Sequence, residues 1–284
     1  MVKLFWEISE KRLTLLTVII IITVMQKRFM KGGSGMENKE KQKKAAAMAA
    51  ASYIQDQMTI GLGTGSTALY LIHEAGSMIR EGRRFQAVAT SEAAETLAVS
   101  LGIPVIHPEE TERVDLAIDG VDEIDGSFCA VKGGGGALLR EKIVAQKAEQ
   151  VIWIMDESKP VKRLGTFPLP VEVLPFGAEW AAEAIRTMGG KAVCRMKDGR
   201  TFFTDNGNMI LDVVMKEDTD LREAAKEIRQ IPGVLETGIF DRICSRIIIG
   251  TGNGVRELVN PNPVKKNVRF EREQADGKMQ ESRE

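Results

Sequence analysis

Histidine and cysteine are scarce in this chain of 284 residues, which contains two histidines and three cysteines. The cysteines form neither a CxxC pair nor a metal-ligand spacing, so the sequence offers no disulfide framework and no cysteine-rich metal site. Cys129, Cys194 and Cys244 are therefore expected to be reduced thiols that pack as small apolar side chains. His73 and His107 fall in an apolar helical pattern and at a strand end, where packing or surface roles are usual. Acid–base chemistry must then come from carboxylates and lysines.

The chain also lacks a large net charge and a long apolar run. Its formal net charge is −1, which predicts no general affinity for nucleic acid or anionic membranes. Residues 13–25 form an apolar stretch that is shorter than the ~20 residues of a membrane-spanning helix. Three interpretations of residues 1–35 stay open: a start site placed too far upstream, a membrane anchor, or a signal peptide without its usual cleavage site. We expect the globular part to begin near Met36, a cytoplasmic location, and membrane contact only if the apolar run is part of the native protein.

Helical and strand patterns alternate from Met36 onward. Short apolar runs typical of buried strands recur at 58–64, 85–91, 114–120 and 151–156, separated by segments with helical spacing. This alternation predicts an α/β fold with an open, mostly parallel, Rossmann-like sheet covered by helices on both faces. A shorter strand is expected at residues 104–107.

A second, smaller domain is predicted after a proline-rich connection. Strand and helix patterns with an Asn-Gly turn indicate an α+β domain over residues 168–240. The main domain would span residues 36–167 and be completed by residues 241–259. Residues 260–284 carry both charges and few apolar side chains, so we expect a solvated, disordered tail.

Ligands of such sheets bind beyond the carboxyl ends of the strands, where four polar segments occur. The first is GLGTGSTA, residues 61–68, at a strand-to-helix junction. Amides at a helix N-terminus together with the hydroxyls of Thr64, Ser66 and Thr67 suit a phosphate group, although a simple helix cap is the alternative. A dinucleotide site is disfavoured, because Ser66 replaces the third glycine of GxGxxG and no acidic residue ends the next strand.

The second segment, AIDGVDEID at residues 117–125, is a cluster of carboxylates. Asp119 ends an apolar strand and would project into the binding crevice, whereas a solvated acidic turn is the usual alternative. A metal site is disfavoured, because no histidine accompanies the cluster and the spacing of a calcium loop is missing.

The third segment, VKGGGGALLREK at residues 131–142, joins a strand to a helix through four glycines. Lys132 ends the strand and Glu141 lies in the first turns of the helix, while Arg140 and Lys142 are expected to be solvated. A base, a cation and a bare backbone suit proton abstraction beside a carbonyl, with an enediolate to stabilise. A flexible loop is the alternative. The fourth segment, MDESK, brings Lys159 to the same edge, either as a surface residue or as a cation for phosphate.

Together with FPLPVEV (167–173) and TDNGN (204–208), these segments resemble the type A ribose-5-phosphate isomerases over residues 39–259. The resemblance implies an aldose–ketose isomerase that interconverts ribose 5-phosphate and ribulose 5-phosphate through an enediol, without cofactor or metal, as a homodimer or homotetramer. It implies Glu141 as the general base, with Asp119, Asp122 and Lys132 at the reacting end. It implies these substrate-binding residues: Thr64, Gly65, Ser66, Thr67, Asp119, Gly120, Val121, Asp122, Lys132, Gly133, Gly134, Gly135 and Lys159. A non-catalytic sugar-phosphate sensor of similar fold is the alternative, but it would not need Glu141 and Lys132 together.

Overall fold

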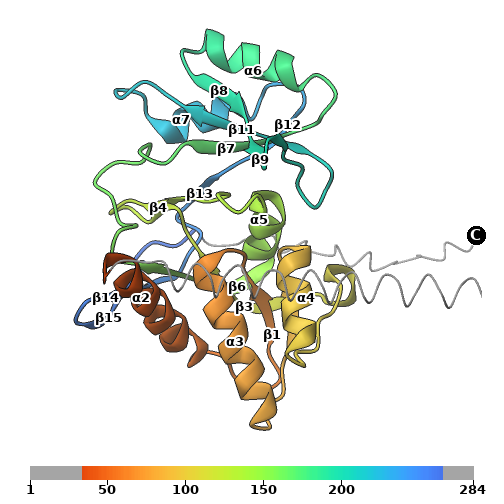
Figure 1. Cartoon of the computed structure of the whole chain (residues 1–284), viewed down its shortest axis with the longest axis vertical. Helices are drawn as coiled ribbons and strands as arrows, with labels where there is room; N and C mark the ends of the chain where they lie inside the picture. The colour runs from red at the N-terminus through yellow and green to blue at the C-terminus, as the bar shows by residue number, and fades with distance from the viewer. Residues whose placement is uncertain (1–33, 265–284) are drawn as a thin grey trace, which may run out of the picture.

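The computed structural model describes residues 34–264 (Figure 1). The apolar run at 13–25 and residues 265–284 of the predicted tail lie outside the described residues. No helix within 34–264 is long and apolar enough to cross a membrane.

The centre of the main domain is a six-stranded sheet with the order β15-β14-β6-β3-β1-β2. Every neighbouring pair is parallel except β14 with β15 at one edge. The predicted open, mostly parallel α/β sheet is thus confirmed. Its strands are β1 (Thr59–Leu62), β2 (Gln86–Ala89), β3 (Val114–Gly120), β6 (Ala148–Asp156), β14 (Arg246–Thr251) and β15 (Gly254–Val259).

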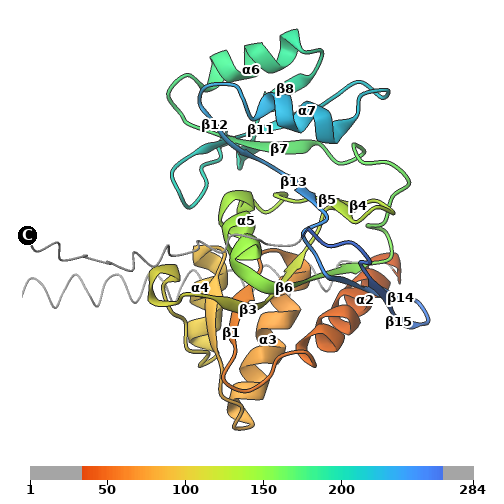
Figure 2. The ribbon, with the colours of Figure 1, turned by 180° about the vertical axis from the view of Figure 1, so that it is seen from behind.

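Helices cover both faces of this sheet because its central strands are apolar on both sides. In β6, Ile152 and Ile154 pack into the core under one set of helices, whereas Val151, Trp153 and Met155 pack into the core on the opposite face. The first face carries three helices, seen in front of the sheet in Figure 1: α2 (Ser34–Ala51), α3 (Ser66–Arg80) and α4 (Glu92–Ser100). The opposite face carries α5 (Leu138–Lys147), which lies in front in Figure 2.

The strand order reverses between β1 and β3, since the chain leaves β1 toward β2 on one side and later returns as β3 on the other. Ligands of open parallel sheets bind at such a reversal, beyond the carboxyl ends of the strands. The segments that follow β1 and β3 therefore form the expected crevice.

A separate four-stranded antiparallel sheet, β12-β7-β11-β8, lies above the main sheet in Figure 1. It has a core cluster of its own, to which two helices contribute. The division into domains stays a prediction, and we use 'small domain' below as a name for residues 168–240. The elements are β7 (Leu169–Val173), α6 (Ala178–Thr187), β8 (Lys191–Cys194), β11 (Met209–Val214), α7 (Leu221–Ile228) and β12 (Val234–Thr237), with a hairpin of β9 (Met196–Lys197) and β10 (Arg200–Thr201).

A small antiparallel sheet connects the two parts of the molecule. It has the order β13-β5-β4 and consists of β13 (Ile239–Asp241), β5 (Cys129–Val131) and β4 (Glu123–Ile124). Because β5 leads directly into Lys132 and the glycines, this sheet fixes where the segment of residues 131–142 begins.

Two local predictions differ from the structure. The prediction of a strand at 104–107 is wrong. Only Val105 forms a β-bridge there, with Ala87, before a 3₁₀ turn begins at Pro108. The proline after His107 favours that turn over a continued strand. Asn260, which we placed in the solvated tail, is instead buried, and its side chain donates to the Cys244 carbonyl at 2.8 Å.

Candidate active site

Three charged side chains are buried together where the third sequence segment meets the end of β3. Lys132 Nζ lies 2.9 Å from Asp119 Oδ2 and 3.2 Å from Glu141 Oε2. The exposed fractions of Lys132, Asp119 and Glu141 are 2%, 4% and 3%. Lys132 also donates to the Gly120 carbonyl at 2.5 Å. One cation therefore stands between two carboxylates, so the cluster carries one negative charge in excess when all three side chains are ionised.

Two aromatic rings help to accommodate the buried ammonium group. Lys132 Nζ lies 5.0 Å from the centroid of the Trp153 ring and 5.4 Å from that of Phe240. A ring face attracts a cation, and the attraction is larger when water is excluded. Burial alone would lower the pKa of Lys132, but Asp119 and Glu141 more than offset this and raise it, so the side chain stays charged.

Asp119 is held by both of its oxygens. Oδ1 accepts from the Thr64 amide at 3.0 Å and from the Gly120 amide at 2.7 Å, while Oδ2 faces Lys132. The carboxylate packs so closely on Gly63 that a Cβ there would lie 2.0 Å from Oδ1. Asp119 is therefore fixed as a partner that orients Lys132.

Glu141 is less fully satisfied than Asp119. Its Oε2 lies within ion-pair distance of Lys132, yet within 34–264 it accepts no hydrogen bond of good geometry. Burial raises the pKa of Glu141 to about 8; Lys132 opposes this rise and the Asp119 carboxylate adds to it. A carboxyl group that titrates near neutrality has the proton affinity that a general base requires.

This pKa predicts a pH-dependent stability difference for Glu141→Gln. The carboxyl has a pKa of about 4.5 in the unfolded chain and about 8 in the folded one, so the folded state binds the proton more tightly. The resulting stabilisation is fully present below about pH 4.5 and is lost as the pH rises to about 8. The glutamine variant does not lose this stabilisation. The melting temperature of the variant minus that of the wild type should therefore increase from pH 5 to pH 8, as measured by differential scanning fluorimetry. Glu183→Gln, at an exposed glutamate of α6, is the matched control. A difference that stays constant over this pH range would contradict the shift.

The first segment forms an open helix N-terminus beside Asp119. Gly65 caps α3 with φ +109°, a conformation that favours glycine, and no side chain caps the helix. Within the described chain, the amides of Gly65, Ser66 and Thr67 have no acceptor. Several free amides at a helix start attract an anion.

The hydroxyl of Thr64 serves a structural role beside these amides. Its Oγ1 lies 2.8 Å from Thr90 Oγ1 and donates to Ser91 Oγ at 2.8 Å. Ser91 in turn caps α4 by accepting from the Ala94 amide at 3.1 Å. This hydroxyl chain ties the ends of β1 and β2 together and so fixes the rim of the crevice.

The four glycines, residues 133–136, form what we call the glycine loop. Gly133 has φ +106° and Gly136 has φ +84°, so both adopt backbone shapes that other residues rarely take. The Gly134 amide donates to Asp122 Oδ2 at 2.7 Å, and a Cβ on Gly134 would lie 2.6 Å from Asp122 Oδ1. Asp122 thus lies at the site, where its carboxylate accepts a hydrogen bond from the glycine loop and fixes the position of that loop.

Lys159 follows β6 and is half-buried. Its carbonyl accepts from the Ile124 amide at 3.1 Å, which places it beside β4. Its ammonium group has no ion-pair or hydrogen-bond partner among residues 34–264, so it is available to an anion. Val121, also predicted at the site, is buried and packs in the core on the α5 face.

Of the two basic neighbours of Glu141, Lys142 is not solvated as predicted, whereas Arg140 is partly exposed. Lys142 is 7% exposed and donates to the carbonyls of Thr237 and Ile239, each at 2.7 Å. Its position on the buried side of α5 requires these partners, because an unpaired buried ammonium group would be costly. Arg140 donates to Asn206 Oδ1 at 2.8 Å and so connects α5 to the small domain.

Sequence reasoning missed the contribution of the small domain to this site. Arg195 donates to the carbonyls of the glycine loop, and Glu172 organises the TDNGN segment by accepting from Thr204 and Asn208 at 3.0 and 2.8 Å. Asp205 of that segment accepts from the Glu92 amide at 2.8 Å. Only the resemblance pointed to TDNGN, and no local pattern marked Arg195.

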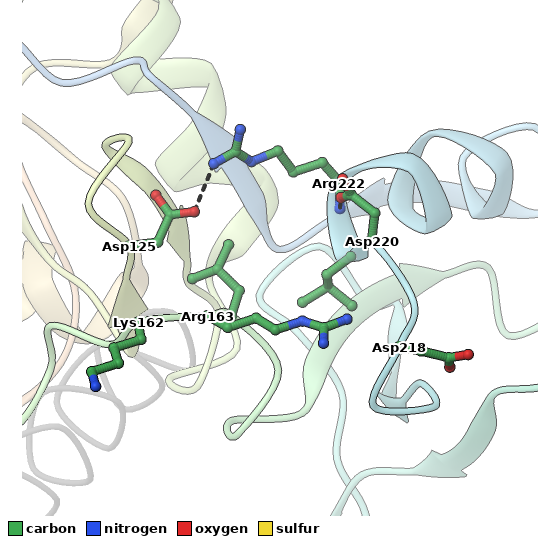
Figure 3. A pocket seen from close by; sticks show the side chains of 8 residues that line it. Asp125, Lys162, Arg163, Asp218, Asp220 and Arg222 are labelled. Atoms are coloured by element: carbon green, nitrogen blue, oxygen red, sulfur yellow. Dashed lines mark hydrogen bonds and ion pairs between the residues drawn. The ribbon is translucent and has the colours of Figure 1, made fainter.

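A separate hollow of about 310 Å³ lies between the end of β4 and the start of α7 (Figure 3). Both basic and acidic side chains line it, and Arg222 reaches across to Asp125 at 2.6 Å. It includes none of the buried triad. Within residues 34–264, no group of three or more His, Cys, Asp or Glu side chains is arranged to hold a metal ion.

Comparisons with known proteins identify a family for this chain. The family model for ribose 5-phosphate isomerase A (phosphoriboisomerase A) matches residues 86–254. The chain is 47% identical to ribose-5-phosphate isomerase A of Bacillus mycoides (strain KBAB4) over 209 residues, 73% of this chain and 95% of that protein. The protein of the same name from Sphingopyxis alaskensis is 47% identical over 206 residues, 72% of this chain and 90% of that protein.

Two solved structures extend the similarity to the fold. Ribose 5-phosphate isomerase A from Methanocaldococcus jannaschii matches with a TM-score of 0.73 and 44% identity, covering 76% of this chain and 97% of that one. A D-ribose-5-phosphate isomerase in complex with phospho-erythronic acid matches with a TM-score of 0.75 and 38% identity, covering 78% of this chain and 99% of that one.

Proposed function

This chain belongs to the ribose 5-phosphate isomerase A family, and from that premise we propose that it interconverts ribose 5-phosphate and ribulose 5-phosphate with Glu141 as the general base. The observation that carries the proposal is the buried triad, in which Lys132 Nζ lies 3.2 Å from Glu141 Oε2. The direct test is turnover of ribose 5-phosphate by the purified protein. An active protein supports the assignment, and a folded protein without turnover would refute it.

The proposed reaction moves two protons and keeps all other atoms in place. The ionised Glu141 removes the proton from the second carbon of the open-chain aldose, and the electron pair forms the double bond of an enediolate. Glu141 then returns the proton to the first carbon, while the hydroxyl proton moves from the second oxygen to the first. The raised pKa of about 8 suits both steps, because the carboxyl can accept and release a proton near neutrality.

Lys132 is proposed to stabilise the enediolate. Negative charge grows on the sugar oxygens as Glu141 takes the proton, and a cation already in place meets it without reorganisation. Asp119 keeps Lys132 in position through the 2.9 Å ion pair. Asp122 is proposed to act at the reacting end by fixing the glycine loop.

The phosphate of the substrate is proposed to bind at the N-terminus of α3. The free amides of Gly65, Ser66 and Thr67 supply donors there, and the helix dipole favours an anion. Lys159 is proposed to add a positive charge. A non-catalytic sensor would need this anion site, but it has no use for a buried Glu141 next to Lys132.

We also propose that the protein acts in the cytoplasm as a homodimer or homotetramer. The family resemblance supports an oligomer, and α6 exposes an apolar surface that a second copy can cover. Trp180 of α6 and Phe176, just before the helix, are 73% and 86% exposed. Light scattering coupled to size exclusion would give the mass in solution.

The reaction is expected to survive treatment with a strong chelator. Both oxygens of Asp119 already accept from groups of the protein, and Lys132 supplies the positive charge that a metal ion would otherwise bring. Initial rates measured before and after dialysis against a chelator should agree. Activity that is lost and then restored by one divalent ion would instead assign the carboxylates to a metal.

A further inference from the structure

The small domain reaches the glycine loop through Arg195, which lies between β8 and β9. Its Nη1 donates to the carbonyl of Gly133 at 2.7 Å and to that of Gly134 at 3.2 Å. We propose that Arg195 is a positioning residue for the isomerisation: it turns these carbonyls away from the reacting centre and thereby aims the amides of the loop toward it. This inference rests on the proposed function of the site.

The planarity of the peptide bond supports this role. In a trans peptide the carbonyl and the following amide point in opposite directions. The Gly134 amide, opposite the Gly133 carbonyl, donates to Asp122 Oδ2 at 2.7 Å, so this peptide is held at both ends. The Gly135 amide lies opposite the Gly134 carbonyl and has no acceptor within the described part of the chain. The Gly133 carbonyl also accepts from the Gly136 amide at 3.0 Å, so Arg195 matters most at the Gly134 carbonyl, whose peptide carries the free Gly135 amide.

Gly135, which carries the free amide, lies beside Thr64 at the end of β1. A Cβ built on Gly135 would be 3.5 Å from Thr64 Cγ2. The Thr64 amide binds Asp119 at 3.0 Å, and Asp119 binds Lys132 at 2.9 Å. These contacts link Gly135 to Lys132 through Thr64 and Asp119. In the proposed role the Gly135 amide and the Lys132 ammonium together stabilise the oxygen that becomes negative.

Arg195 is itself held rigidly. Asp212 Oδ2 accepts from its Nε at 3.0 Å and Oδ1 from its Nη2 at 2.5 Å, a two-point contact that fixes the plane of the guanidinium group. The Arg195 side chain is only 13% exposed. Phe202 of the same domain packs on the loop so closely that a Cβ on Gly136 would lie 2.4 Å from its Cζ. A run of glycines, which otherwise samples many conformations, is thereby held in one.

Arg195→Met tests the inference, with Arg186→Met as the matched control. Arg186 also joins a carboxylate, Glu179, to a main-chain carbonyl, that of Ala192, but it does not contact the glycine loop. Loss of one oriented donor to an oxyanion lowers kcat by about 10²–10³-fold. We expect a kcat loss of about 10²-fold in Arg195→Met with KM nearly unchanged, and no loss in Arg186→Met.

Two inhibitors separate positioning from general damage. Phospho-erythronic acid carries a planar carboxylate that resembles an enediolate, whereas inorganic phosphate tests the anion site alone. We expect Arg195→Met to weaken inhibition by phospho-erythronic acid at least about tenfold and to leave inhibition by phosphate unchanged. Arg195→Lys should recover part of kcat, because lysine can donate to one carbonyl but cannot make the two-point contact with Asp212.

Each result decides the proposal. A folded Arg195→Met protein with kcat near that of wild type would overturn it, as would equal weakening of both inhibitors. If Arg195→Met does not fold, Arg195→Lys decides by the same criteria. A wild-type protein that does not turn over ribose 5-phosphate refutes the proposed function, whereas an active wild type with an unimpaired variant refutes only the role of Arg195.

Discussion

Glu141→Gln should lower kcat by at least about 10²–10⁴-fold, the usual contribution of a positioned general base. The amide keeps the shape of the buried side chain but cannot accept the proton. KM should change little, because the proposed phosphate contacts lie at the N-terminus of α3 and at Lys159. The measurement is steady-state turnover of ribose 5-phosphate.

The control for this variant is Glu183→Gln, at an exposed position of α6. Both variants should keep the circular dichroism spectrum of the wild type, and Glu183→Gln should keep its activity. If folded Glu141→Gln turned over within a few-fold of wild type, the proton acceptor would have to be Asp119 or Asp122. Both of those carboxylates already accept hydrogen bonds from backbone amides.

Lys132→Met should also reduce the rate strongly, by about 10²–10³-fold in kcat, because it removes the charge that meets the developing oxyanion. Lys159→Met should instead raise KM, because its proposed partner is a phosphate that is charged throughout the reaction. Steady-state kinetics of the two variants compare these effects. The same pattern in both would contradict this division of roles.

The Lys132 variant has a second expected effect, on the pH profile. Lys132 lowers the pKa of Glu141, so its removal should move the acid limb of kcat/KM to higher pH. Two buried carboxylates would then lack their cation, which is destabilising, so circular dichroism must first show that the variant is folded. An acid limb at the wild-type position would show that the two side chains are not coupled.

The main sheet and the buried triad could be predicted because each depends on local patterns. Asp119 and Lys132 end apolar strands, Glu141 follows a helix start, and parallel strands bring such ends to one edge. The prediction of a strand at 104–107 was wrong because the chain forms only one bridge, at Val105, before the turn that begins at Pro108.

Contacts between the two domains could not be predicted from local patterns. The burial of Lys142 depends on the carbonyls of Thr237 and Ile239, about a hundred residues away. The hydrogen bonds from Arg195 to the glycine loop likewise depend on how the small domain packs against the main one. Hydrophobic periodicity reports which side of an element is buried, but it does not report which partner covers it.

Exchange of solvent deuterium into the sugar tests the central claim most directly, because it follows the proton rather than the overall rate. In heavy water the wild type should introduce deuterium at the second carbon of ribose 5-phosphate, as detected by nuclear magnetic resonance. Glu141→Gln should do so slower by at least about 10²-fold. Exchange in the variant at the wild-type rate would show that another group carries the proton and would contradict the role of Glu141.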